Sequence, residues 1–181
     1  MPIINVRRGA WSALLAAALL AVGFTGAQAA DASSFTEQAS MAGLSTAQAG
    51  ELQRQVDAYV AQTGGRQISA NKIDLGGGAL VVALPGETYA RDVAAPLAPP
   101  PCYAGDLCLY SGQNYTGSYL YFYKCQTVFV PWYTTGSFND NQTSGTISTF
   151  ERISPPGHLR YVAKVKVPSI NWANIGNITV C

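Results

Sequence analysis

Residues 109–123 read LYSGQNYTGSYLYFY, and the spacing of their aromatic residues is the strongest structural signal in the chain. Four small or polar residues separate Tyr110 from Tyr115, and Gly117 follows after one more residue. We expect the chain to leave one strand, fold over in a tight hairpin and enter the next strand, with both rings packed over the fold. Gly117 would then adopt a backbone angle that carries a steric cost for other residues.

The run that follows alternates, because Tyr119, Tyr121 and Tyr123 share one face of a strand while Leu120 and Phe122 share the other. If Leu120 and Phe122 face the core, the three tyrosines line the outside of the sheet. Aromatic side chains gathered on a surface are candidates for binding a protein or a glycan. The alternative is a tyrosine-rich surface that simply faces solvent.

Residues 102–181 as a whole predict an all-β domain. Short runs of β-branched and aromatic residues, such as LCLY, TVFVPWY, TISTFERI and LRYVAKVKV, are separated by turns rich in Gly, Asn, Pro and Ser. Strands of this length and spacing favour a sandwich or a barrel. Within 160–167 the alternation predicts one strand, with Tyr161 and Val165 on its buried face and Lys164 on its wet face.

Residues 1–29 have the order of a secretory signal peptide. Arg7 and Arg8 precede an apolar run, and small residues then lead to a cleavage site near Ala30. The apolar run has about 15 residues, whereas a membrane span needs roughly 20, so an uncleaved anchor is the weaker alternative. We therefore expect a secreted, extracellular protein that has no membrane contact after cleavage.

Residues 30–92 predict a small α+β leader or pro-like segment, consisting of a helix and a β-hairpin. Ser45 fits the cap at the helix start, and Gly64 fits its end. Two short segments, 66–74 and 79–85, flank a glycine-rich turn and predict the two strands of the hairpin.

Residues 93–101 read VAAPLAPPP and predict a Pro-rich linker. Proline-rich stretches act as semi-rigid spacers, and exposed linkers are also where proteinases cut. We therefore place the domain boundary here, so that residues 102–181 form a domain of their own and the leader can be removed.

All four cysteines, Cys102, Cys108, Cys125 and Cys181, lie after this linker. An even number of cysteines in a small exported domain predicts disulfide bonds. Three pairings are open, and we favour Cys102–Cys108, close in sequence, with Cys125–Cys181, which ties down the C-terminus. A zinc site is the alternative, but His158 is the single histidine and no CxxC spacing occurs.

The charge balance excludes some partners. The signal peptide contains two of the eleven basic residues, so nine basic and ten acidic residues remain after its removal. A chain this close to neutrality, with no basic stripe, is not expected to bind nucleic acid.

A second element, FNDNQTSG, begins about 20 residues after the tyrosine spacing. It supplies oxygen ligands of the type that calcium prefers, although Asp140 is the one charged group among them. The candidate ligands are Asn139, Asp140, Asn141, Thr143 and Ser144. The alternative is a structural loop held by its own Asn and Asp side chains. No cofactor is required on this interpretation, and calcium is the single candidate.

These motifs together carry a resemblance. The aromatic-x4-aromatic-x-Gly spacing resembles a βγ-crystallin Greek key, and the Asn-Asp-x-x-Thr-Ser element resembles its calcium-binding loop. With the cysteines added, the segment resembles peptidase inhibitor family I36, a group of secreted bacterial βγ-crystallin-like proteins. The matching residues are Cys102, Gly105, Cys108, Leu109, Tyr110, Asn114, Tyr115, Gly117, Cys125, Phe138, Asn139, Asp140, Thr143 and Ser144.

The resemblance implies a βγ-crystallin-like Greek-key sandwich, whose second, eroded key would occupy 154–181. It also implies an inhibitor that blocks the cleft of a secreted proteinase, with metalloproteinases among the candidate targets. No residue matches a reactive bond, so the sequence does not place the inhibitory loop.

We do not expect an enzyme. His158 lies in a turn without a nucleophile motif nearby, and Asp106, Asp140 and Glu151 are the acidic residues after the linker. The alternatives to an inhibitor are a calcium-binding structural module and a domain that binds cell wall or glycan through the tyrosine face.

Overall fold

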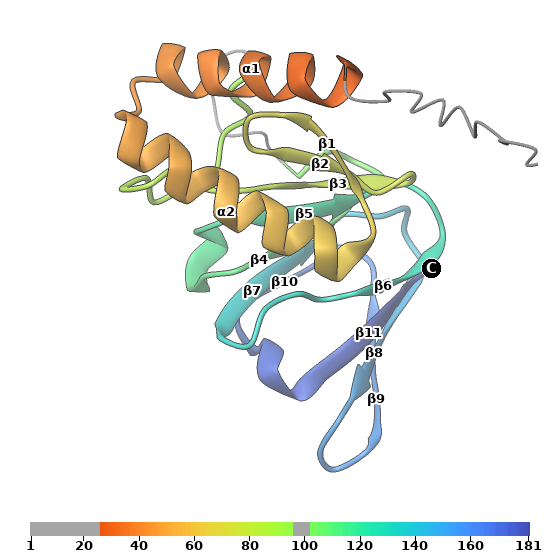
Figure 1. The fold of residues 1–181 in the computed structure, drawn as a ribbon. Helices are drawn as coiled ribbons and strands as arrows, with labels where there is room; N and C mark the ends of the chain where they lie inside the picture. Colours follow the sequence, from red (N-terminus) through yellow and green to blue (C-terminus); the bar gives the residue numbers. More distant parts are fainter. Residues whose placement is uncertain (1–25, 96–101) are drawn as a thin grey trace, which may run out of the picture.

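The computed structural model describes residues 26–95 and 102–181. The predicted signal peptide and the proline-rich part of the linker therefore lie mostly outside the described residues. Two helices come first, α1 (Gly26–Met41) and α2 (Thr46–Thr63), and strands follow. The helices lie at one end of the molecule and a long hairpin lies at the other (Figure 1).

The strands form two antiparallel sheets. The first sheet has seven strands, in the order β1 (Arg66–Ser69), β2 (Lys72–Asp74), β3 (Gly78–Val81), β5 (Tyr119–Phe122), β4 (Leu107–Tyr110), β7 (Thr135–Asp140) and β10 (Val165–Asn171). The second has four, in the order β6 (Gln126–Phe129), β11 (Ile175–Val180), β8 (Ile147–Arg152) and β9 (Gly157–Val162).

Strands β4 to β11 form two Greek keys that exchange one strand each. In the first key, β4, β5 and β7 lie in the seven-stranded sheet and β6 crosses to the other sheet. In the second key, β8, β9 and β11 lie in the four-stranded sheet and β10 crosses back. This arrangement confirms the predicted βγ-crystallin-like sandwich, including the second key that the sequence barely marks.

Helix α2 forms where the sequence predicts it. The Ser45 hydroxyl accepts a hydrogen bond from the backbone N–H of Gln48, whose side chain accepts one from the backbone N–H of Ser45. Gly64 ends the helix in the left-handed conformation, with φ 68°. Helix α1 was not predicted, because its alanine-rich start coincides with the expected signal cleavage site.

The predicted hairpin has three strands instead of two. Residues 66–74, predicted as one strand, turn back at Ala70 and Asn71 to form β1 and β2. The Asn71 side chain fixes this turn, because its amide donates to the carbonyls of Val82 and Arg91, at 2.8 and 2.7 Å.

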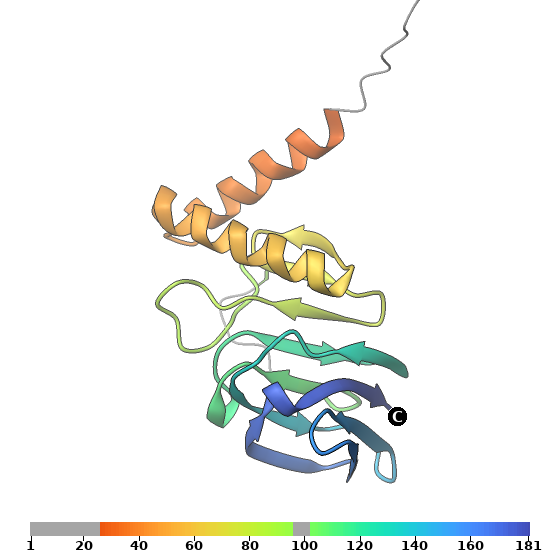
Figure 2. The same cartoon turned by 60° about the horizontal axis from the view of Figure 1, so that its bottom comes forward.

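The leader strands join the sheet of the segment that follows them. Strand β3 pairs with β5, so that Leu80 lies opposite Leu120 and Gly78 opposite Phe122. Turning the molecule shows β1 to β3 as a continuation of the sheet below the helices (Figure 2). Removal of the leader in the mature protein stays a prediction.

The strand predicted over 160–167 is divided between the two sheets. β9 ends at Val162, and β10 begins at Val165 in the opposite sheet. Lys164 has φ 75° at the crossing, where its backbone N–H donates to the carbonyl of Asp140 at 2.7 Å. The alternation therefore predicted the buried face correctly but missed the break in the strand.

One buried row crosses the seven-stranded sheet. Neighbouring strands contribute Ile73, Leu80, Leu120, Leu109 and Phe138 in register, and each of the five is fully buried. Burying a side chain of this kind contributes about 1.5–3 kcal/mol relative to leaving it exposed.

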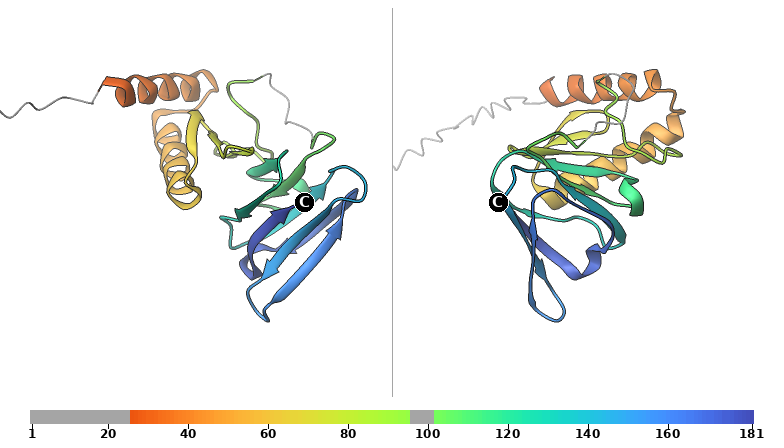
Figure 3. Two further views of the ribbon diagram at one scale, coloured as in Figure 1. Left: turned by 90° about the vertical axis from the view of Figure 1, so that its right-hand side faces the viewer. Right: turned by 180° about the vertical axis from the view of Figure 1, so that it is seen from behind.

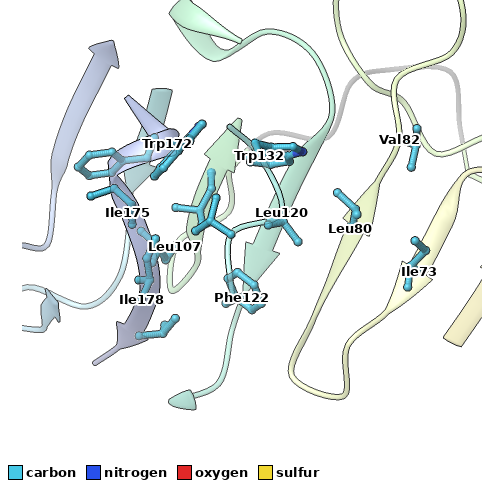
Figure 4. Close-up of a cluster of buried hydrophobic side chains, with 14 of the residues drawn as sticks. Ile73, Leu80, Val82, Leu107, Leu120, Phe122, Trp132, Trp172, Ile175 and Ile178 are labelled. Atoms are coloured by element: carbon cyan, nitrogen blue, oxygen red, sulfur yellow. The ribbon is translucent and has the colours of Figure 1, made fainter. Parts of the chain in front are cut away.

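The core that contains this row is continuous. The second sheet adds Ile178 and the segment before it adds Trp172, while α2 adds Leu52 and Val56. Side chains from both parts of the chain meet around Leu120 and Trp132 (Figure 4).

Candidate functional site

The hairpin that joins β4 to β5 has the geometry that the tyrosine spacing predicts. The rings of Tyr110 and Tyr115 meet edge to face with their centroids 5.6 Å apart. Gly117 has φ 78°, in the left-handed region that favours glycine. Burial, followed by the neighbouring Tyr115, raises the pKa of Tyr110 to about 12, so that its phenol stays neutral.

Ser137 on β7 holds this hairpin in place through two hydrogen bonds. This role was not predicted from the sequence. The fully buried hydroxyl of Ser137 accepts from the backbone N–H of Tyr115 at 2.8 Å and donates to the carbonyl of Gly112 at 2.7 Å. One serine thus satisfies two backbone groups at the point where the chain folds over. Ser137 precedes the Phe-Asn-Asp motif directly, which is the one sequence signal that could have indicated it.

The tyrosines on β5 and just after it differ in how far they are exposed to solvent. Leu120 and Phe122 face the core, which is the condition on which the outward tyrosine face depended. Tyr119 is 6% exposed because Val81 and Ala90 of the leader pack over it, whereas Tyr123 is 56% exposed. Tyr119 is therefore covered as the structure stands, which corrects the expectation that all three tyrosines line the outside.

A ladder of rings lies along this face. Tyr110 and Tyr119 stack with their centroids 6.0 Å apart, and Tyr119 and Tyr121 stack at 5.7 Å. The Lys72 ammonium lies 5.9 Å from the centroid of Tyr121 and pairs with Asp92 at 2.8 Å. Residues from the leader therefore cover one part of the ladder and contribute charge to another.

Asp140, the charged residue among the predicted calcium ligands, is hydrogen-bonded within the chain. The Asp140 carboxylate is fully buried and accepts from the hydroxyl of Ser148 at 2.8 Å and the backbone N–H of Gln142 at 3.3 Å. Burial raises the pKa of this carboxyl, against the smaller effect of these hydrogen bonds. Asn139 lies on β7, and Thr143 and Ser144 are exposed in the turn that follows.

Asn141 already contacts a cation. The Lys164 ammonium donates to the backbone carbonyl and to the side-chain oxygen of Asn141, both at 3.0 Å. The amide of Asn141 donates in turn to the carbonyl of Cys102 at 3.0 Å, which ties the loop to the first disulfide. Lys164 was not expected here from the sequence, because it lies more than 20 residues from Asn141.

Both favoured disulfides are present. Cys102 pairs with Cys108, with their Cα atoms 5.9 Å apart, and Cys125 pairs with Cys181, with their Cα atoms 5.3 Å apart. The first closes the turn that leads into β4, and the second joins the start of β6 to the chain end after β11. In the chain-entropy model a loop of this second size contributes about 4 kcal/mol to stability.

The described residues contain a cavity but no cluster of metal-ligating side chains. No group of three or more His, Cys, Asp or Glu side chains that could hold a metal ion occurs among them. A cavity of about 430 Å³ lies between α1 and α2, and its lining includes Phe35, Leu44 and Leu52 but no acid or histidine. Neither α1 nor α2 is long and apolar enough to cross a membrane.

The sequence model of peptidase inhibitor family I36 matches residues 95–149. These residues, the I36 segment, are similar to that family. The I36 segment ends within β8 and so contains the whole first Greek key, the first disulfide and the Asn141 loop. No curated protein and no solved structure matches the chain.

The match to a peptidase inhibitor family supports proteinase inhibition in general. The I36 match does not extend to β9, β10 and β11, which complete the sandwich around the I36 segment. The leader also lies outside it.

Proposed function

We propose that this protein inhibits a secreted proteinase by filling its substrate cleft. The observation that carries the proposal is the I36 match over residues 95–149, which contains the whole first Greek key of the sandwich. Metalloproteinases are the first target class to examine, and the proposal does not depend on a cofactor.

The rigidity of the module supports a steric mechanism. Two disulfides and a continuous core hold the loops of the sandwich in place before any partner binds. A loop that is already ordered loses little conformational entropy when it docks, which favours tight binding. A mobile surface would lose more.

Export to an oxidising compartment is part of the same proposal. Both disulfides need such a compartment to form and persist. The signal peptide predicted at residues 1–29 would provide the route, and cleavage near Ala30 would leave α1 without its first residues.

The alternatives have weaker physical support. A calcium-binding module needs free oxygens, but the oxygens of Asn141 contact the Lys164 ammonium. A glycan-binding face needs accessible rings, but Tyr119 is covered by the leader. Tyr123 alone among the three predicted tyrosines is well exposed.

An inhibition assay tests the proposal. The oxidised full chain is titrated against thermolysin-type metalloproteinases and against trypsin-, elastase- and subtilisin-type serine proteinases. We expect at least one of them to be inhibited at micromolar concentration or below, and the inhibition to be lost after reduction and alkylation of the four cysteines. Absence of inhibition across the panel by correctly oxidised protein would refute the proposal.

A further inference from the structure

The hairpin of β8 and β9 projects beyond the sandwich. Views from two sides show it extending away from the helices and past the body of the molecule (Figure 3). The last pair of the ladder is Arg152 with Gly157, so residues 153–156 form the tip. All four tip residues are exposed, and Ile153 presents a large aliphatic side chain that is 56% exposed.

The tip is held rigidly although it is exposed. The backbone N–H of Ile153 donates to the carbonyl of Asn174 at 3.0 Å. The backbone N–H of Ser154 donates to the side-chain oxygen of the same Asn174 at 2.8 Å. Asn174 lies in the short 3-10 helix η2 (Trp172–Asn174), which starts at the fully buried Trp172.

Proline restricts the rest of the tip. Pro155 and Pro156 fix two of its φ angles, which lowers the number of conformations that the free loop can adopt. The tip is therefore narrow, carries one large aliphatic side chain, and is ordered before it meets a partner. These properties suit insertion into a concave cleft, where most pockets are lined by apolar groups.

We propose that this tip is the part of the molecule that enters the proteinase cleft, with the Ile153 side chain filling a pocket for aliphatic residues. The inference rests on the proposed function and adds the contacting residue and the chemistry of the pocket. The tip lies outside the I36 match, which ends at residue 149. Asn174 is a positioning residue, because it holds the backbone of Ile153 and Ser154 and does not reach the partner itself.

The experiment compares inhibition constants of full-chain variants against the proteinase that the wild type inhibits. Ile153→Ala removes most of the aliphatic side chain, and Ile153→Asp places a charge in the pocket. We expect losses of about tenfold or more for the first and a larger loss for the second. Val162→Ala is the matched control, because Val162 is 59% exposed on the same hairpin but lies at its base.

A second pair of variants tests the support of the tip. Asn174→Ala removes the side-chain acceptor of the Ser154 N–H and should weaken inhibition. Asn174→Asp keeps an acceptor oxygen at this position and should restore most of it. Thermal midpoints measured alongside show that each variant is folded.

The outcomes separate this inference from the proposed function. If the wild type inhibits none of the proteinases, both fail together. If the wild type inhibits and the folded Ile153→Asp protein inhibits equally well, the hairpin assignment is wrong and the proposed function stands. If Arg152→Ala abolishes inhibition while Ile153→Ala does not, the pocket takes the basic residue, and the aliphatic assignment is overturned.

Discussion

At the scale of single residues, buried polar side chains decide how the chain turns. Ser137 satisfies two backbone groups where the first key folds over, and Asn71 satisfies three where the leader turns back. Each such residue lies far in sequence from the groups that it contacts. An unpaired backbone group in a buried site costs about 1–3 kcal/mol, so one side chain can determine a turn.

Ser137→Ala should therefore destabilise the protein without altering its fold. The substitution leaves the N–H of Tyr115 and the carbonyl of Gly112 without their partner, at a cost of about 2–4 kcal/mol in the free energy of unfolding. Denaturant titration followed by circular dichroism measures this loss. Ser144→Ala, in an exposed turn, serves as the control and should change stability by less than about 0.5 kcal/mol. Equal stability of the two variants would show that the two hydrogen bonds of the Ser137 hydroxyl contribute nothing to the free energy of unfolding.

Lys164 provides a prediction about calcium. Its ammonium occupies the two oxygens of Asn141, and a like charge at this distance opposes the entry of a cation. Lys164→Met keeps the length of the side chain and removes the charge, so calcium affinity should rise by about fivefold or more.

Isothermal titration with calcium chloride measures the effect of Lys164→Met. Lys166→Met is the control, because it removes an exposed charge two residues further along the chain. Calcium binding by the wild type that matches the variant would mean that the Lys164 contact gives way to the ion at no cost.

At the scale of elements, the start and end of helix α2 are determined by capping residues next to it in the sequence. Ser45→Ala removes the oxygen that accepts from the Gln48 N–H and should lower the free energy of unfolding by about 1 kcal/mol. Ser45→Asp keeps a capping oxygen and should stay within a few tenths of the wild type. Thermal melting followed at the helix band of the circular dichroism spectrum compares the three proteins, and equal midpoints would rule out a stabilising cap.

Elements with signals of this kind could be predicted from the sequence, and elements defined by distant partners could not. The caps of α2 and the folded hairpin at Tyr110 and Tyr115 lie within a few residues of what they cap or cover. The crossing of β10 to the other sheet depends on contacts between Lys164 and the loop at Asp140 and Asn141. An alternating sequence pattern does not indicate contacts between residues that are distant in sequence, so it cannot predict this crossing.

The same distinction applies to the candidate site. The alternation correctly placed Leu120 and Phe122 on the face opposite the tyrosines, because the period of a strand is local. It could not show that Ala90, some 30 residues earlier, covers Tyr119. The projecting tip at Ile153 was also missed, since protrusion depends on where the rest of the sandwich ends.

At the scale of the whole molecule, the two parts of the chain share one core. Strand β3 pairs with β5, and the indole N–H of Trp132 donates to the hydroxyl of Tyr59 on α2 at 3.2 Å. The cluster that contains Leu52 of α2 also contains Ile178 of β11. A shared core of this kind predicts that the leader and the sandwich unfold together while the chain is intact.

Leu52→Ala tests this coupling. Leu52 is 1% exposed, and its truncation should lower the free energy of unfolding by about 2–5 kcal/mol. Hydrogen exchange then shows which elements lose stability. Amides that exchange only through global unfolding lose protection by the full change in the free energy of unfolding. We expect amides of α2 and of β11 to lose protection by similar amounts, whereas Val162→Ala, at an exposed position, should affect neither. Loss of protection confined to α2 would show instead that the leader opens independently, as a segment that is later removed would need to do.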